Sequence, residues 1–203
     1  RLDRPGFMTV DVRTLTEPEE RHAAIPALSD LRIRIFRGWP YLYDGTADYE
    51  AEYLAEFIRE PGSALVVAQD GDAIVGAATA SPMAGQKPEF QEPLRRHGLD
   101  IARIFYFGES VLLPAYQGQG IGHRFFDARE AAARAAGAVQ TSFCAVIRPD
   151  DHPMRPASPR DLHPFWRARG YAPVPGLTGT LEWQDVGDTS ESAHPMQFWM
   201  RNL

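Results

Sequence analysis

A glycine-rich segment in the middle of the chain constrains the fold more than any other feature. The segment 117–122 reads QGQGIG, and it joins the apolar run 104–113 to an alanine-rich stretch over about 121–136. The apolar run predicts a buried strand, and the alanine-rich stretch predicts a helix closed by Gly137. The start of such a helix has unpaired N–H groups, and glycine lets an anion approach them closely. The segment therefore predicts a site for a diphosphate.

Two common phosphate motifs do not fit this segment. The nucleotide-hydrolase loop needs Gly, four residues, then Gly-Lys and Ser or Thr, and the chain has no such run. The dinucleotide fingerprint needs a glycine where His123 stands, and it follows the first strand of a βαβ unit. Here the strand is roughly the fourth in the chain, so both motifs are excluded.

The rest of the chain predicts a mixed α/β order of elements. Apolar periodicity and turn residues place these elements along the sequence. The expected strands are 10–15, 64–68, 74–79, 141–147, 178–183 and 196–200, the second and third forming a hairpin about Asp70-Gly71-Asp72; the expected helices centre on 28–35, 54–58 and 165–169; and residues 81–100 and 148–164 are expected to be proline-bearing loops.

The pattern Gln-x-x-Gly-x-Gly at 117–122 resembles the acyl-coenzyme A motif of the GNAT (GCN5-related N-acetyltransferase) superfamily. The order of elements from Thr9 to Leu203 is also similar to that family, as is the late run 165–171, FWRARGY. The resemblance implies an α/β fold with a mixed, mostly antiparallel central sheet, a splayed central parallel pair and about four flanking helices. Residues 9–203 are expected to form a single domain, with 1–8 as a natural extension or an expression remnant.

The resemblance also implies which residues hold the coenzyme. The backbone of the central strand would hold the pantetheine arm, the glycine turn the pyrophosphate, and the late helix the thiol end. The residues for the pantetheine arm are Val111, Leu112 and Leu113. Those for the pyrophosphate are Gln117, Gly118, Gln119, Gly120, Ile121 and Gly122, with His123 and Arg124 adding charge. Those for the thiol end are Phe165 and Trp166. For His123 and Arg124 a solvated helix face is the alternative, and for Phe165 and Trp166 it is a place in the core.

Glu109 is the candidate general base. It interrupts an apolar run, and a buried unpaired carboxylate costs several kcal/mol, so the position needs an explanation. A base would help because a primary amine with a pKa of about 10.4 is almost fully protonated at neutral pH. The alternative for Glu109 is a structural ion pair with one of the 20 arginines. Gly108 beside it suggests a bulge.

Two departures from the family pattern affect the expected chemistry. Trp166 stands where members often have a tyrosine that protonates the departing thiolate, so a general acid would come from elsewhere, with Tyr171 or Tyr43 as candidates. Arg148 begins the run Arg-Pro-Asp where members often have an asparagine. Cys144, the single cysteine, lies in an apolar strand and is expected to be a core residue rather than a nucleophile.

The acceptor is expected to bind in the segment between the first two predicted helices. Aromatic rings and carboxylates there could receive a cation. The candidate residues are Trp39, Tyr41, Tyr43 and Asp44, with Asp48 nearby and a second wall at Asp150, Asp151 and His152. The alternative is a loop whose rings only pack on the core.

Composition narrows the class of partner. Asp and Glu number 27 against 21 Lys and Arg, which argues against nucleic acid. No apolar run approaches the ~18 residues of a membrane span, one cysteine permits no internal disulfide, and His152 and His163 match no metal spacing. The sequence thus predicts a cytoplasmic, metal-free N-acyltransferase using acetyl-coenzyme A on a small-molecule or peptide amine. A homodimer, O-transfer and longer acyl donors stay open, and a non-catalytic acyl-coenzyme A sensor is the alternative.

Overall fold

The computed structural model describes residues 9–203, so the expectation for residues 1–8 lies outside the described part of the chain. Seven strands form one sheet in the order β1-β2-β3-β4-β5-β7-β6, and only β4 and β5 run parallel. The strands are β1 (Asp11–Leu15), β2 (Ala64–Asp70), β3 (Ala73–Pro82), β4 (Ile104–Leu112), β5 (Gln140–Val146), β6 (Ala172–Gln184) and β7 (Glu191–Asn202). The predicted fold class is confirmed.

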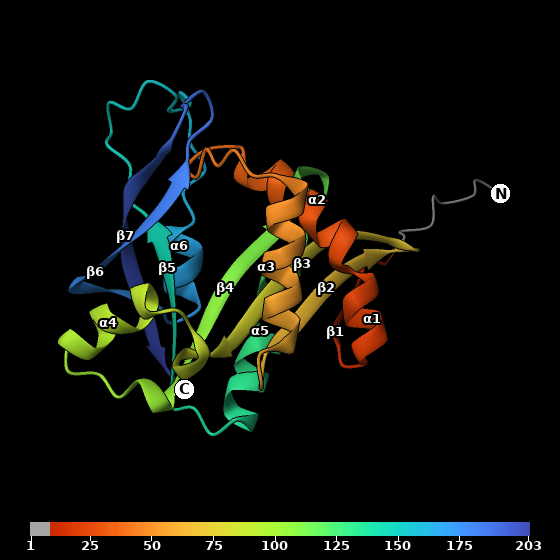
Figure 1. Ribbon diagram of the computed structural model, residues 1–203. Helices are drawn as coiled ribbons and strands as arrows, with labels where there is room; N and C mark the ends of the chain where they lie inside the picture. The colour runs from red at the N-terminus through yellow and green to blue at the C-terminus, as the bar shows by residue number, and fades with distance from the viewer. Residues whose placement is uncertain (1–8) are drawn as a thin grey trace.

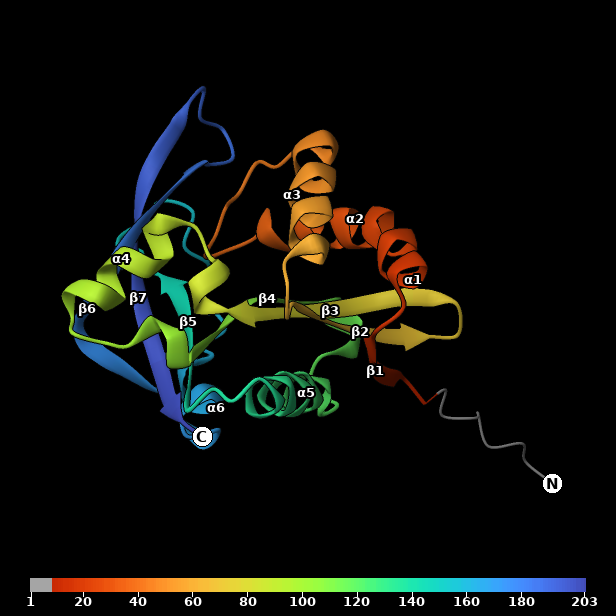
Figure 2. The same cartoon turned by 60° about the horizontal axis from the view of Figure 1, so that its bottom comes forward.

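In residues 9–203, six α-helices flank this sheet: α1 (Pro18–Ala23), α2 (Ile25–Phe36), α3 (Ala47–Arg59), α4 (Pro88–Arg96), α5 (Ile121–Ala135) and α6 (His163–Ala168). Figure 1 shows α2 and α3 crossing the sheet in front of β2, β3 and β4. In Figure 2 the sheet is seen nearly edge-on, with α2 and α3 on one side and α5 on the other. Because helices cover both faces, the residues 65–68 of β2 are all fully buried.

The longest helix, α5, forms as the sequence predicts. Its buried face carries Ile121, Phe125 and Ala133 at helical spacing, and this face packs on the sheet. The helix ends at Ala135, and Gly137 then adopts a φ of +77°, the left-handed conformation that glycine supplies at a helix end.

The loop predicted over residues 81–100 is wrong in part, because α4 lies within it. Pro88 occupies the first turn of this helix, where its fixed φ is favourable and no N–H is needed. Phe90 and Leu94, one turn apart, face the cluster that α4 forms with β6 and β7, and Leu94 is fully buried. The late hairpin is also longer than predicted, since β6 and β7 span 13 and 12 residues.

The feature that positions the site is the divergence of β4 from β5. The two strands pair only over residues 104–106 and 140–142. Beyond Tyr106, β4 continues alongside β3 to Leu112, whereas β5 continues alongside β7 to Val146. A wedge-shaped gap therefore opens in the middle of the sheet. No helix among residues 9–203 is both long and apolar enough to cross a lipid bilayer.

Candidate active site

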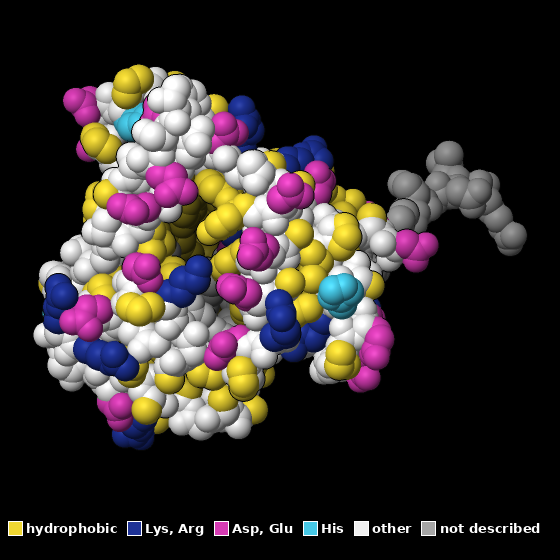
Figure 3. Space-filling view, in the orientation of Figure 1, with side chains coloured by type: hydrophobic (Ala, Val, Ile, Leu, Met, Phe, Trp, Pro, Cys, Tyr) yellow, Lys and Arg dark blue, Asp and Glu magenta, His cyan; other side chains and the backbone are white. Residues whose placement is uncertain are grey.

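A cavity of about 1690 Å³ occupies the gap between β4 and β5 and reaches both faces of the sheet. Figure 3 shows its mouth on the face that carries α3, with apolar side chains inside it. On the other face its lining includes the glycine turn and α6. The cavity therefore joins the predicted coenzyme residues to the predicted acceptor residues through the sheet.

A β-bulge shapes β4 where it borders the cavity. Ala78 pairs with Ser110 but Ala80 pairs with Phe107, so β4 carries one extra residue opposite Thr79. The Glu109 N–H donates to Thr79 Oγ1 at 3.2 Å. A Cβ on Gly108 would lie 2.4 Å from the same oxygen, so any larger residue here would have to displace the Thr79 side chain. The bulge expected at Gly108 is present.

Backbone groups on one edge of β4 face the gap, and the Leu112 carbonyl accepts from the side-chain amide of Gln117 at 3.5 Å. The N–H of Leu113 donates to the Val75 carbonyl at 3.0 Å, so this residue bonds to the β3 side. Because backbone groups alternate in direction along a strand, those of Leu112 and Ser110 face the gap. Of the three residues predicted to hold the pantetheine arm, only Leu112 lines the cavity, while Val111 is buried against the α2–α3 side. Ser110 was missed, although strand alternation could have identified it.

The glycine turn forms an open cradle at the start of α5. Gly118 and Gly120 have φ values of +76° and +82°, and a Cβ at either position would meet no atom within 4 Å. Backbone conformation rather than crowding therefore requires glycine here. The N–H groups of the first helical turn have no intrahelical acceptor, and that turn contains no acidic residue. This arrangement fits a diphosphate.

The side chains of the turn divide between the cavity and the surrounding structure. Gln117, Gly118, Gly120, Ile121, Gly122 and His123 line the cavity. Gln119 is instead exposed, and its side-chain amide donates to the Ala115 carbonyl at 3.1 Å. Arg124 donates to the Val10 carbonyl at 2.9 Å, which ties α5 to the residue that precedes β1. Arg124 is therefore occupied away from the cradle.

Phe165 and Trp166 both line the cavity, and both are partly buried and pack against the core. Phe165 packs on the ring of His123 at 4.7 Å between centroids, and a Cβ on Gly122 would lie 3.3 Å from the Phe165 ring. Trp166 lies 5.0 Å from Trp199 and 4.9 Å from Phe143. The helix α6 therefore forms a wall of the cavity beside the start of α5, and a contact of these two rings with the coenzyme stays a prediction.

Glu109 points away from α5, toward α2. Its carboxylate forms an ion pair with Arg32, which also pairs with the fully buried Glu50. Tyr43 donates to the other oxygen of Glu50 at 2.9 Å. Burial lowers the pKa of the Arg32 guanidinium, but Glu109 and Glu50 outweigh that effect and raise it. The predicted alternative of an arginine pair is thus present, and Glu109 nevertheless lines the cavity with a side chain only 7% exposed.

The structure does not bring Tyr171 to the cavity. Its ring is buried among the aromatic residues of the α5 side, and its hydroxyl shares hydrogen bonds with Thr141 at 2.8 Å and Glu130 at 3.1 Å. Burial also raises the pKa of the Tyr171 phenol, which makes it a weaker acid at neutral pH. Other phenols line the cavity instead, and these are Tyr41, Tyr43, Tyr49, Tyr53 and Tyr106.

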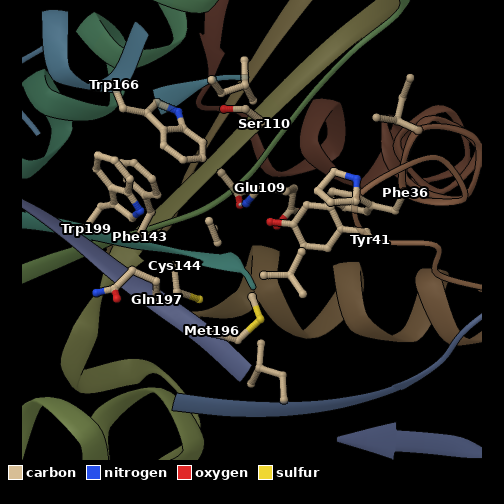
Figure 4. Close-up of a pocket in the computed structure, with 18 of the residues that line it drawn as sticks. Phe36, Tyr41, Glu109, Ser110, Phe143, Cys144, Trp166, Met196, Gln197 and Trp199 are labelled. Carbon is tan, nitrogen blue, oxygen red and sulfur yellow. The ribbon is translucent and has the colours of Figure 1, made fainter. Parts of the chain in front are cut away.

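The loop between α2 and α3 lies along the cavity, as expected. Trp39, Tyr41 and Tyr43 line it, whereas Asp44 forms an ion pair with Arg37 outside it. Figure 4 shows the Tyr41 hydroxyl directed toward the space beside Glu109. Burial raises the pKa of Tyr41, so this phenol stays protonated at neutral pH. The second wall predicted at residues 150–152 does not line the cavity, although the His152 ring packs on Trp39 at 5.4 Å.

Arg148 holds this loop in place. Its guanidinium donates two hydrogen bonds of 2.8 Å to Asp185 and also reaches the carbonyls of Pro40 at 2.8 Å and Tyr41 at 2.7 Å. Trp183 donates to the Tyr41 carbonyl and to Asp185, both at 3.0 Å. We call Arg148, Asp185 and Trp183 the latch. The sequence marked Arg148 only as a departure from the family pattern and gave no signal for its partner.

No group of three or more His, Cys, Asp or Glu side chains in residues 9–203 is arranged to hold a metal ion. Cys144 lies 3.1 Å from the Tyr106 hydroxyl, and burial raises the pKa of its thiol to about 11. Cys144 is therefore protonated at neutral pH, which makes it a poor nucleophile.

Comparison with known proteins identifies what the fold is similar to. The family model described as "Acetyltransferase (GNAT) family" matches residues 25–157. A ribosomal-protein-alanine N-acetyltransferase from Brucella melitensis is 16% identical, with a TM-score of 0.60 and coverage of 95% of this chain and 99% of that chain. A phosphinothricin acetyltransferase from Sinorhizobium meliloti in complex with acetyl-coenzyme A is 19% identical, with a TM-score of 0.59 and coverage of 97% and 89%.

A third solved structure, an aminoglycoside 6′-N-acetyltransferase complexed with coenzyme A, is 18% identical, with a TM-score of 0.59 and coverage of 95% of this chain and 96% of that chain. Among curated proteins none matches this sequence. At these identities the solved structures establish the fold and leave the acceptor open.

Proposed function

We propose, on the premise that the chain belongs to the acetyltransferase (GNAT) family, that it transfers an acetyl group from acetyl-coenzyme A to an amine. One observation carries this proposal: the cavity runs through the sheet from the glycine cradle on one face to the carboxylate of Glu109 on the other. Two of the structural neighbours are complexes with coenzyme A or acetyl-coenzyme A. The cradle supplies the backbone N–H groups that a pyrophosphate needs.

The residues of β4 support a direct transfer in a ternary complex. Backbone groups of Ser110 and Leu112 face the gap, where they can hold the pantetheine arm and polarise a thioester carbonyl. Glu109 sits on the acceptor side of the same strand, where it can attract an ammonium group and take its proton. Arg32 orients this carboxylate. Cys144 is protonated, so no covalent acyl-enzyme is invoked.

The amine proton and the leaving group are handled separately. Glu109, directly or through water, takes one proton from the ammonium, and the neutral nitrogen then forms a bond to the acyl carbon as the C–S bond breaks. The second nitrogen proton passes to the thiolate, whose ordinary pKa is about 8.5. Trp166 lines the cavity, but its indole N–H is not a useful acid. At this position of α6 the chain therefore has no phenol that could protonate the thiolate.

Thermal unfolding with and without acetyl-coenzyme A tests the donor site first. Ligand at about 100 times its dissociation constant adds about 2.7 kcal/mol of stability. We expect a higher midpoint for the wild type and no shift for a folded Gly120→Glu variant, because its carboxylate would enter the cradle. Gly98→Glu, a positive-φ glycine that does not line the cavity, is the matched control and should keep the shift. No shift for the wild type at millimolar coenzyme would refute the donor site.

Turnover then separates an enzyme from a non-catalytic acyl-coenzyme A sensor. Trp166 at the acid position and the Arg32–Glu109 ion pair are the observations that favour the sensor. For an enzyme, Glu109→Gln should lower kcat/KM by about 10²–10⁴ while coenzyme binding is retained. Glu182→Gln, at another carboxylate of the cavity lining, is the control. A thermal shift without turnover on a broad amine panel would establish the sensor instead.

A further inference from the structure

We propose that the acceptor is a primary amine that carries one positive charge on a flat, apolar body. This inference rests on the proposed function and names its substrate class. It is drawn from the part of the cavity around Glu109 on the α2–α3 side, which we call the acceptor chamber. Its walls include Phe36, Tyr41, Cys144 and Met196. Figure 4 shows these side chains arranged about the carboxylate of Glu109.

The walls of the chamber are apolar and largely aromatic. The rings of Phe36 and Tyr41 lie 5.0 Å apart, and Met196 and Cys144 present sulfur and carbon atoms opposite them. A flat apolar body gains free energy by removing such surfaces from water, and sulfur and aromatic rings contact one another favourably. A sugar or a polyol would instead leave its hydroxyl groups without hydrogen-bond partners.

Most polar side chains that reach the chamber already have hydrogen-bond partners within the protein. The Tyr106 hydroxyl is hydrogen-bonded to the Cys144 sulfur, and the Tyr43 hydroxyl donates to Glu50. The side-chain amide of Gln197 donates to the Val174 carbonyl at 2.8 Å. The carboxylate of Glu109 and the Tyr41 hydroxyl beside it are thus the groups best placed to meet a ligand. Because both lie at the same place in the chamber, they call for a single polar end on the ligand.

The charge in the chamber matches one ammonium group. Glu50 and Glu109 are both at least nine-tenths buried and share the guanidinium of Arg32, which leaves a formal charge of −1 on the α2–α3 side. Arg129, whose charge also acts on Glu109, lies over the rings of Phe107 and Phe126 on the α5 side of the cavity. One ammonium neutralises this cluster. A second ammonium would be buried without a partner, which costs several kcal/mol. Acidic side chains also gather along both sides of the mouth, interrupted by a Lys or Arg, and favour the approach of a cation.

The latch makes the aromatic wall a fixed surface. Arg148 and Trp183 both hold the Tyr41 carbonyl, and the N–H of Val186 donates to the Leu42 carbonyl at 2.7 Å. The Asp44 N–H also donates to the Gln184 carbonyl at 2.9 Å. The loop is therefore bonded to the β6–β7 hairpin on both sides of Tyr43. Such a wall suits a small rigid body better than a long flexible polycation.

Steady-state kinetics with saturating acetyl-coenzyme A test the proposal. The acceptors are 2-phenylethylamine, spermidine and a short peptide with a free N-terminus. We expect kcat/KM for 2-phenylethylamine to exceed that for each of the others by at least tenfold. Equal or faster turnover of spermidine or of the peptide would overturn the substrate class while leaving the proposed function intact.

A binding measurement keeps the inference testable if no amine turns over. Trimethyl(2-phenylethyl)ammonium has the same charge and ring but cannot attack a thioester, and its affinity is measured by calorimetry with coenzyme A present. We expect Tyr41→Leu to weaken binding at least fivefold, and Phe36→Leu serves if that variant does not fold. Tyr49→Leu, at an exposed ring on the rim, is the control. No binding by the wild type, or equal binding by the Tyr41 and Tyr49 variants, would overturn the proposal.

Discussion

Removal of the Arg148 guanidinium should destabilise the protein more than the loss of any exposed ion pair. The Arg148 and Asp185 side chains are 8% and 14% exposed, and Arg148 makes four hydrogen bonds of 2.7–2.8 Å. Breaking one partner of a buried pair costs about 3–5 kcal/mol because the other charge stays buried. In a domain of this size that loss lowers the unfolding midpoint by about 6–20 °C.

The assay is chemical denaturation of Arg148→Met, Asp185→Asn and the double variant. The two residues should be coupled by about 1–3 kcal/mol, since they contact directly. Arg37→Met is the matched control, because its pair with Asp44 is 55% and 35% exposed and should contribute less than about 1 kcal/mol. The reasoning fails if Arg148→Met costs no more than this control, or if the coupling is below about 0.5 kcal/mol.

The same pair predicts a dependence of stability on pH. Burial raises the pKa of the Asp185 carboxyl, but the hydrogen bonds and charge of Arg148 outweigh that effect and lower it. The folded pKa is therefore below the unfolded value of about 3.9. The contribution of this group is present above that value and is lost as the pH falls through the lowered pKa. Asp185→Asn should remove this part of the acid dependence.

Three further changes have expected outcomes. Gly108→Ala should lower the free energy of unfolding in denaturant by about 1–3 kcal/mol, because its Cβ would lie 2.4 Å from Thr79 Oγ1. Adding Thr79→Ala should restore part of this loss, and the absence of any rescue would contradict the proposed clash. Gly122→Val should weaken coenzyme binding in calorimetry at least tenfold, because its Cβ lies 3.3 Å from Phe165 and larger atoms would displace that ring. Cys144, with a pKa of about 11, should react with a thiol reagent at pH 8 about 100-fold more slowly than a peptide thiol, and fast labelling would refute the raised pKa.

The parts of the fold predicted from the sequence are those with local signals. The turn at 117–122, the helix after it and the hairpin about Gly71 depend on glycine conformations and apolar spacing within a few residues. The helix α4 was missed because Pro88 and Pro93 were interpreted as loop residues, although proline is favourable in a first helical turn. Pro93 lies within the helix and gives no such signal.

The partners of the charged residues could not be predicted. Glu109 could have paired with any of 20 arginines, and Arg32 lies 77 positions before it. Arg148 and Asp185 are 37 positions apart, and only the late hairpin brings them together. Tyr171 was a candidate general acid because Trp166 replaces the usual tyrosine, but its side chain turns into the core, where Glu130 and Thr141 hold it. Such contacts depend on the packing of distant elements.

The extra residue in β4 reverses the phase of the strand. Before it, Phe105 and Phe107 face the helix α5; after it, Glu109 and Val111 face α2 and α3, although all four positions are odd. One continuous strand thus places aromatic rings on the α5 side of the sheet and a carboxylate on the α2–α3 side. A strand that kept all of its residues but lacked the bulge would place Glu109 on the α5 side with Phe105 and Phe107. Deletion of Gly108 would instead make the alternation regular and leave Glu109 opposite Thr79 on the α2–α3 side. The side of the sheet that Glu109 faces therefore depends on the bulge at Gly108.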